Sequence, residues 1–159
     1  MIAFVFPGQG SQKIGMGREL AERFPECEET FAQADAALEL SLSSLCFEGP
    51  ADQLVLTEHT QPAVMAVSVA ALRALTARGV SAQWLAGHSL GEYTAYVAAG
   101  TLSFGDALRT VRNRGRYMQE AVPLGKGAMA VIMGLDEPKV VQACTEVADG
   151  QVVSPANLN

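Results

Sequence analysis

Ser89 gives the clearest signal for chemistry in this sequence of 159 residues. It lies in a Gly87-x-Ser89-x-Gly91 pattern, after the apolar residues 84–86 and before an alanine-rich segment. GxSxG between a strand and a helix is typical of a nucleophile elbow, in which glycines allow a tight turn and the serine hydroxyl stands clear at the helix N-terminus. Free N–H groups there favour a developing oxyanion. The pattern predicts a nucleophilic serine; the alternative is a serine that only caps the helix.

A nucleophilic serine needs a base to accept its proton, and the sequence contains two histidines. His88 adjoins Ser89, but neighbouring side chains at a strand end point to opposite faces. We therefore interpret His88 as a buried, hydrogen-bonded histidine that supports the elbow. His59 lies in a polar stretch that we expect to be a loop. Neither is a convincing base.

A second candidate is the loop Gly8–Gln12, which follows the apolar residues 2–6. It is not a phosphate motif, because Lys13 replaces the third glycine of GxGxxG and the pattern GxxxxGK[ST] is absent. What remains is a glycine-flanked loop with free backbone N–H groups after a strand, or a plain turn.

The elements that position these residues alternate along the chain. Strands are predicted at residues 2–6 and 80–86, and helices at 18–24, 26–38, 90–99 and 103–121, the last with a capping box that starts at Ser103. Another helix is expected from Thr60, as N-cap, to Arg78, with Pro62 in its first turn. This alternation indicates an α/β fold with a parallel sheet.

The pattern changes at the glycine cluster of residues 125–127. Residues 128–133 and 152–153 are predicted strands, and residues 136–148 a predicted helix between them. We therefore expect a domain boundary here, followed by a β-α-β unit.

Composition excludes several function classes. Eleven basic against 17 acidic residues give a net charge of −6, which disfavours nucleic-acid binding through bulk charge. Cys27, Cys46 and Cys144 form no CxxC pair, so no metal site is expected. The sequence shows neither a signal peptide nor an apolar run of ~20 residues that could span a membrane, which favours a cytoplasmic protein without membrane contacts.

Five motifs in order carry a family resemblance: residues 4–12, 60–63, 87–93, 114–119 and 127–130. Together they resemble the malonyl-coenzyme A:acyl carrier protein transacylases of fatty acid synthesis over the whole chain. The acyltransferase domains of polyketide synthases are the closest competitor.

The resemblance implies roles at matched positions. Ser89 would carry malonyl as an ester, the backbone N–H groups of Gln9 and Leu90 would form the oxyanion hole, and Arg114 would hold the malonyl carboxylate. The implied partners are malonyl-coenzyme A and acyl carrier protein, with no further cofactor. A serine hydrolase, in which water replaces the carrier thiol, uses the same elbow and is the main alternative.

Helical geometry bears independently on Arg114. At ~100° per residue, Arg114 lies about 70° from the centre of the apolar face of residues 104–122, closer than Arg109, Arg112 or Arg116. It is thus the arginine of this helix nearest the interior, although an edge arginine that extends to water also fits. The other three are expected to form a solvated basic face.

The implied fold is an α/β-hydrolase-like large domain, to which residues 1–126 would belong. Residues 127–159 would be the first part of an inserted ferredoxin-like small domain. Family members are about twice as long and carry a catalytic histidine beyond the position of Asn159. We therefore expect residues 1–159 to be part of a longer polypeptide and to lack appreciable turnover alone; a non-catalytic fragment is the remaining hypothesis.

Overall fold

The computed structural model describes residues 1–123 and 125–158, which divide into two compact units, Met1–Leu124 and Gly125–Asn159. Each unit is described by itself below. None of the helices in these described residues is long and apolar enough to cross a membrane.

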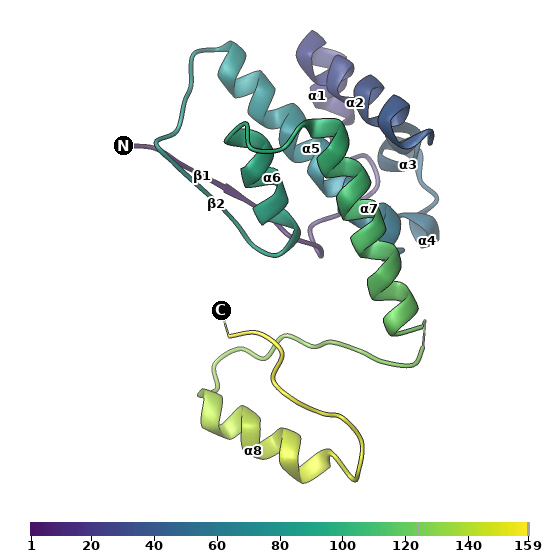
Figure 1. Ribbon diagram of the computed structural model, residues 1–159, viewed down its shortest axis with the longest axis vertical. Coiled ribbons are helices and arrows are strands. Elements are labelled where there is room, and N and C mark those ends of the chain that lie inside the picture. Colours follow the sequence, from purple (N-terminus) through teal and green to yellow (C-terminus); the bar gives the residue numbers. More distant parts are fainter. Residues whose placement is uncertain (124, 159) are drawn as a thin grey trace. The chain divides into compact units, whose positions relative to one another are not determined.

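The first unit contains a small parallel sheet. Strand β1 (Ala3–Phe6) pairs with β2 (Trp84–Gly87), with Ala3 opposite Trp84 and Phe6 opposite Gly87. Five helices connect them: α1 (Arg18–Arg23), α2 (Pro25–Leu38), α3 (Leu42–Glu48), α4 (Ala51–Leu54) and α5 (Thr57–Ala77). Helix α6 (Leu90–Ala98) packs on both strands (Figure 1). The expected α/β fold with a parallel sheet is confirmed.

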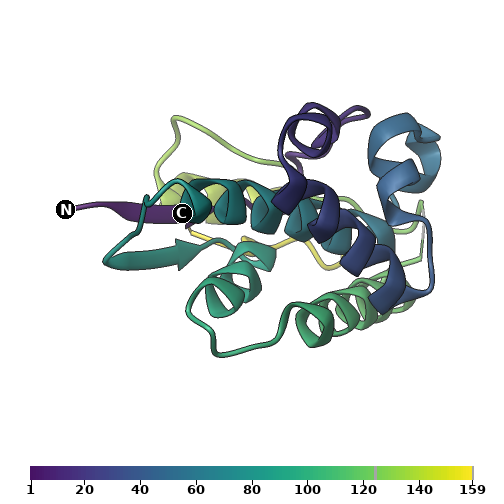
Figure 2. The same cartoon turned by 90° about the horizontal axis from the view of Figure 1, so that it is seen from above.

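The core of this unit is helical and is centred on α5. This helix packs against α2, α6 and α7 (Phe104–Ala121), and it buries Val64, Met65 and Val69. Helix α2 contributes Phe31, Ala34 and Leu38, whose 3–4 residue spacing forms one apolar stripe. Both ribbon views show the strands at one end of the unit and α3 and α4 at the other (Figures 1 and 2).

The start of α5 differs from the expectation. The helix begins at Thr57 rather than after Thr60, so Thr60 is not its N-cap and Pro62 lies inside the helix. The Thr60 hydroxyl donates to the carbonyl oxygens of Leu54 (2.6 Å) and Leu56 (3.1 Å). Contacts with the preceding segment thus replace the predicted cap and extend the helix by one turn.

Two short helices were not predicted. α3 and α4 occupy residues 42–48 and 51–54, where Leu42, Leu45 and Leu54 are buried against the core. These helices are too short to show a clear periodicity in the sequence, and tertiary packing decides their conformation.

The second unit contains helix α8 (Glu137–Val147), close to the predicted range. The strands expected at residues 128–133 and 152–153 are wrong for this structure, in which residues 125–158 contain no strand. A strand requires a partner for its backbone N–H and C=O groups, and the described part of the chain provides none here.

Candidate active site

Ser89 lies on a sharp turn between β2 and α6. Its backbone has φ 54° and ψ −107°, a conformation with positive φ that residues other than glycine seldom adopt. A Cβ atom on Gly87 would overlap the Gly91 carbonyl, and one on Gly91 would overlap the Phe6 carbonyl oxygen. Both glycines of the motif are therefore required by close backbone approach, and the predicted strand–turn–helix context of Ser89 is present.

The turn presents backbone donors beside the serine. Leu90 is the first residue of α6, so its N–H has no acceptor within its own helix. The next N–H groups are engaged in the turn: Gly91 donates to the His88 carbonyl (2.8 Å) and Glu92 to that of Ser89 (3.2 Å).

The loop that contains Gln9 passes against this turn. A Cβ on Gly8 would come within 2.9 Å of the His88 carbonyl oxygen, so the loop backbone contacts the elbow directly. The Gln9 side chain is exposed, and its Nε2 donates to Thr57 Oγ1 at the start of α5 (3.4 Å). The structure thus brings the Gln9 loop and the elbow together.

Arg114 extends from α7 to the serine. Its Nη2 donates to Ser89 Oγ at 2.9 Å, and its Nη1 donates to Gln61 Oε1 at 2.8 Å. The guanidinium carbon also lies 5.8 Å from the centre of the Tyr93 ring, within cation–π range. The arginine that helical geometry placed nearest the interior therefore contacts the candidate nucleophile.

Helix α7 is fixed at both its start and its middle. The Ser103 Oγ accepts a hydrogen bond from the Asp106 N–H (3.2 Å), which is one of the two bonds of the predicted capping box. The Asp106 carboxylate accepts from the Ser103 hydroxyl (2.6 Å) rather than from the Ser103 N–H. Buried side chains follow at 3–4 residue intervals: Phe104, Ala107, Leu108 and Val111. At Gly115, a Cβ would come within 2.5 Å of the Thr57 carbonyl oxygen. This glycine allows α7 to approach the first turn of α5 beside Arg114.

Gln61 lies in the motif at residues 60–63, but no role was predicted for it from the sequence. Its side chain is 0% exposed, and its Nε2 donates to Met118 Sδ at 3.2 Å while its Oε1 accepts from Arg114. One signal for a role was present in the sequence, since Gln61 is a single amide at the start of the long apolar run of α5. A buried polar group needs hydrogen-bond partners, so such an amide is expected to bond another side chain.

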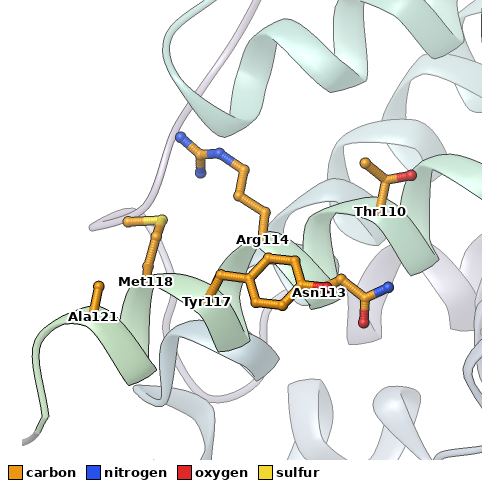
Figure 3. A pocket seen from close by; sticks show the side chains of 6 residues that line it. All are labelled: Thr110, Asn113, Arg114, Tyr117, Met118 and Ala121. Carbon is orange, nitrogen blue, oxygen red and sulfur yellow. The ribbon is translucent and has the colours of Figure 1, made fainter.

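A cavity of about 510 Å³ adjoins the arginine. It is lined entirely by α7, through Thr110, Asn113, Arg114, Tyr117, Met118 and Ala121 (Figure 3). Arg114 and Met118 rise from the same side of the helix in this view. The depression is open to its surroundings and has Arg114 as part of its lining.

The histidines differ from expectation. His88 is exposed rather than buried, and its side chain makes no hydrogen bond within the described residues; its backbone supports the elbow instead, through bonds with Phe6 and Gly91. Alternate residues of β2 are exposed as well, so among the described residues of this unit nothing covers the face of the strand to which His88 is adjacent. His59 lies in α5 rather than in a loop, with Nδ1 3.0 Å from the Gln53 carbonyl oxygen. Neither ring contacts Ser89 in the part of the chain that the structure describes.

The basic face of α7 is less free than predicted. Arg109 pairs with Asp106 (2.7 Å), and the half-buried Arg112 donates to the Leu38 carbonyl oxygen (2.9 Å). Arg116 is exposed, as expected.

Comparison with known proteins defines the class. Residues 3–157 match the acyl transferase domain family, and the chain belongs to this family. Among its relatives are the malonyl CoA-acyl carrier protein transacylases of Escherichia coli K12 (54% identity over 158 residues) and Bacillus subtilis 168 (54% over 159 residues). These alignments cover 99% of this chain and 51% and 50% of the relatives, so the chain spans about half the length of the curated relatives it matches.

Solved structures agree with this assignment. The malonyl CoA-acyl carrier protein transacylase of Coxiella burnetii matches with a TM-score of 0.93 and 52% identity over 99% of this chain and 50% of the other. A malonyl-transacylase solved in complex with its type II polyketide synthase acyl-carrier protein matches with a TM-score of 0.92 and 52% identity, over 98% of this chain and 51% of the other.

Proposed function

We propose that the whole protein carrying this chain transfers malonyl from coenzyme A to the phosphopantetheine thiol of an acyl carrier protein. Ser89 Oγ attacks the thioester carbonyl carbon, the C–S bond breaks, and coenzyme A leaves as a thiol with the serine proton. The carrier thiol then attacks the malonyl-serine ester, the C–O bond breaks, and Ser89 regains its proton. No cofactor beyond the coenzyme A substrate is required.

The contact between Arg114 Nη2 and Ser89 Oγ carries this proposal. Arginine has five N–H donors, and the bonds to Ser89 and Gln61 use two, so enough remain for a bidentate carboxylate. Because the same guanidinium touches the nucleophile, the carboxylate and the reacting carbonyl of an acyl group must be close together. The single methylene of malonyl suits this geometry better than the longer spacers of succinyl or glutaryl.

The N–H groups of Leu90 and Gln9 are the proposed oxyanion hole. Leu90 directly follows the nucleophile at the free start of α6, and the Gln9 loop lies against the elbow. The base comes from neither His59 nor His88 in their present positions. Since the chain spans about half of its relatives, we propose that the rest of the whole protein supplies a histidine for this role. It would also complete an α/β-hydrolase-like large domain and a ferredoxin-like small domain around residues 127–159.

The proposed setting is cytoplasmic fatty acid synthesis. A type II polyketide carrier is the second candidate partner, because a relative with 52% identity was solved with such a carrier. Transfer assays with one carrier of each type distinguish the two.

A mass measurement tests the nucleophile. Incubating the whole protein with malonyl-coenzyme A should leave a malonyl adduct on the peptide that contains Ser89, and Ser89→Ala should abolish it. An adduct that persists in Ser89→Ala would refute the assignment. Addition of carrier protein should move the adduct to the carrier thiol; release as free malonate in the presence of carrier would instead indicate the hydrolase.

The substrate carboxylate is tested at Arg114. Arg114→Ala should reduce malonyl transfer while acetyl transfer stays equal or improves, because only malonyl has a carboxylate to lose its partner. Equal losses for both acyl groups would show that Arg114 is structural.

A further inference from the structure

Gln61 is a buried amide with both of its polar atoms directed at α7. Its side chain is 0% exposed, its Oε1 accepts from Arg114 Nη1 at 2.8 Å, and its Nε2 lies 3.2 Å from Met118 Sδ. The chemistry fixes this orientation, because a flipped amide would direct its N–H₂ at the donors of the guanidinium. A buried amide without partners is costly, so these contacts constrain both side chains.

The spacing of the two helices keeps this contact in place. Gly115 allows α7 to pack on the backbone of Thr57 and Glu58, four and three residues before Gln61 on α5. The glutamine and the arginine therefore face each other across a tight helix–helix contact.

We propose that Gln61 is a positioning residue that orients Arg114 toward Ser89 and thereby sets the preference for acyl groups that carry a carboxylate. This inference rests on the proposed function. A neutral amide suits the task because it accepts a hydrogen bond from the guanidinium without neutralising its charge. A carboxylate at position 61 would form an ion pair with Arg114 and compete with the substrate.

The chain contains a second glutamine–arginine pair that serves as a control. Gln33 Oε1 accepts from Arg73 Nη1 at 2.9 Å, in the same kind of Gln–Arg pair, between α2 and α5. Arg73 instead lies over the Phe104 ring and bonds Thr30, with no contact to Ser89. Gln33 is exposed whereas Gln61 is 0% exposed, so this control tests the loss of a glutamine–arginine hydrogen bond as such. The comparison of malonyl with acetyl transfer within Gln61→Met tests for a general effect of disturbing a buried contact.

The test compares Gln61→Met, an unbranched replacement of similar length, with Gln33→Met in the whole protein. Gln61→Met should raise the KM for malonyl-coenzyme A about tenfold, the factor expected for one hydrogen bond to a charged group, and change acetyl transfer by a much smaller factor. Gln33→Met should change neither. Gln61→Glu should reduce the preference for malonyl over acetyl at least as much. If Gln61→Met fails to fold, the Gln61→Glu result decides alone.

A double-mutant cycle separates positioning from general structure. In an Arg114→Ala background, Gln61→Met should have no further effect on the malonyl-to-acetyl ratio, because the group it positions is gone. Equal losses for both acyl groups, the same loss in Gln33→Met, or an undiminished effect in the Arg114→Ala background would overturn the proposal.

A binding measurement distinguishes failure of this inference from failure of the proposed function. Phenylmethylsulfonyl fluoride is a neutral reagent for nucleophilic serines, and malonate bound at Arg114 should slow its reaction with Ser89. The malonate concentration for half-protection should rise about tenfold in Gln61→Met and not in Gln33→Met. This result would support Gln61 even if transfer to a carrier were never observed. A lack of protection in the unsubstituted protein would refute carboxylate binding at Arg114, on which the proposed function rests. Equal half-protection concentrations in the two variants would refute the role of Gln61.

Discussion

Helix α7 places its apolar side chains on one face of residues 104–115, whereas residues 128–133 of the second unit are apolar at every position, and the structure uses the two segments differently. In α7 the apolar residues recur every three or four positions and are buried, with Leu108 and Val111 each 0% exposed. In the second unit Met129, Val131 and Met133 are 77%, 83% and 85% exposed. Helix α7 meets α5 and α2 within its own unit, whereas residues 128–133 have no sheet partner among the described residues. An apolar segment is buried only where its surroundings supply a complementary surface.

Amide hydrogen exchange should give the largest contrast between the two units. In the 159-residue chain, amides in the middle of α5 should exchange through global unfolding, at least ~10³ times more slowly than those of residues 129–133. Mass spectrometry of peptides after timed labelling measures the difference. Comparable protection at 129–133 would mean that these residues pair in solution.

Thiol reactivity gives a second contrast. Burial raises the pKa of Cys46 to about 12, with a smaller contribution from the Asp35 carboxylate. Since the thiolate is the reactive form, only roughly one in 10⁴ of these thiols is ionised at pH 8. Cys144, on the more accessible α8, should therefore react with iodoacetamide well before Cys46 and Cys27. Peptide mapping after partial alkylation identifies the order, and denaturant should remove it.

Truncation of one side chain in each unit tests the energetic difference. Leu108→Ala should lower the free energy of unfolding by about 2–5 kcal/mol, because it removes packing from a site that is 0% exposed. Val131→Ala should change it by less than about 0.5 kcal/mol. Urea unfolding of both variants measures the two values, and a large effect at Val131 would contradict the comparison.

Acid should produce the smallest effect, confined to the first unit. Hydrogen bonds from Ser103, and then from Arg109, lower the pKa of Asp106 below its ordinary value of 3.8. A lowered folded-state pKa means that this contribution to stability is complete above the unfolded-state pKa and is lost as the pH falls through the folded-state value. The melting temperature should fall slightly less with acid in Asp106→Asn than in the unsubstituted chain. Identical slopes would show that the Asp106 contacts contribute nothing.

The elbow and Arg114 could be predicted because their signals are local. Two glycines flank Ser89 at fixed spacing, and the position of Arg114 follows from counting residues around one helix. Gln61 could not be assigned a role in this way, because its partners are 53 and 57 residues away. Such contacts depend on how α5 crosses α7, which no local pattern specifies.

The errors have the same origin. Thr60 has the residue type of an N-cap, but its hydroxyl bonds carbonyls of the preceding segment, and α5 begins earlier. His88 was expected to be a buried, hydrogen-bonded histidine that supports the elbow, yet its side chain is exposed and only its backbone bonds the elbow. In each case the residue type was interpreted correctly in isolation, and the tertiary surroundings changed its role.

The positive φ of Ser89 lowers the stability of the fold at the same residue that is proposed to carry the activity. A side chain at φ 54° has an unfavourable backbone energy of about 1–2 kcal/mol, which glycine would avoid. Ser89→Gly should therefore be thermally more stable than the unsubstituted protein although it lacks the hydroxyl. Selection for stability alone would favour glycine at this turn, so a serine here is what selection for the proposed nucleophile would produce.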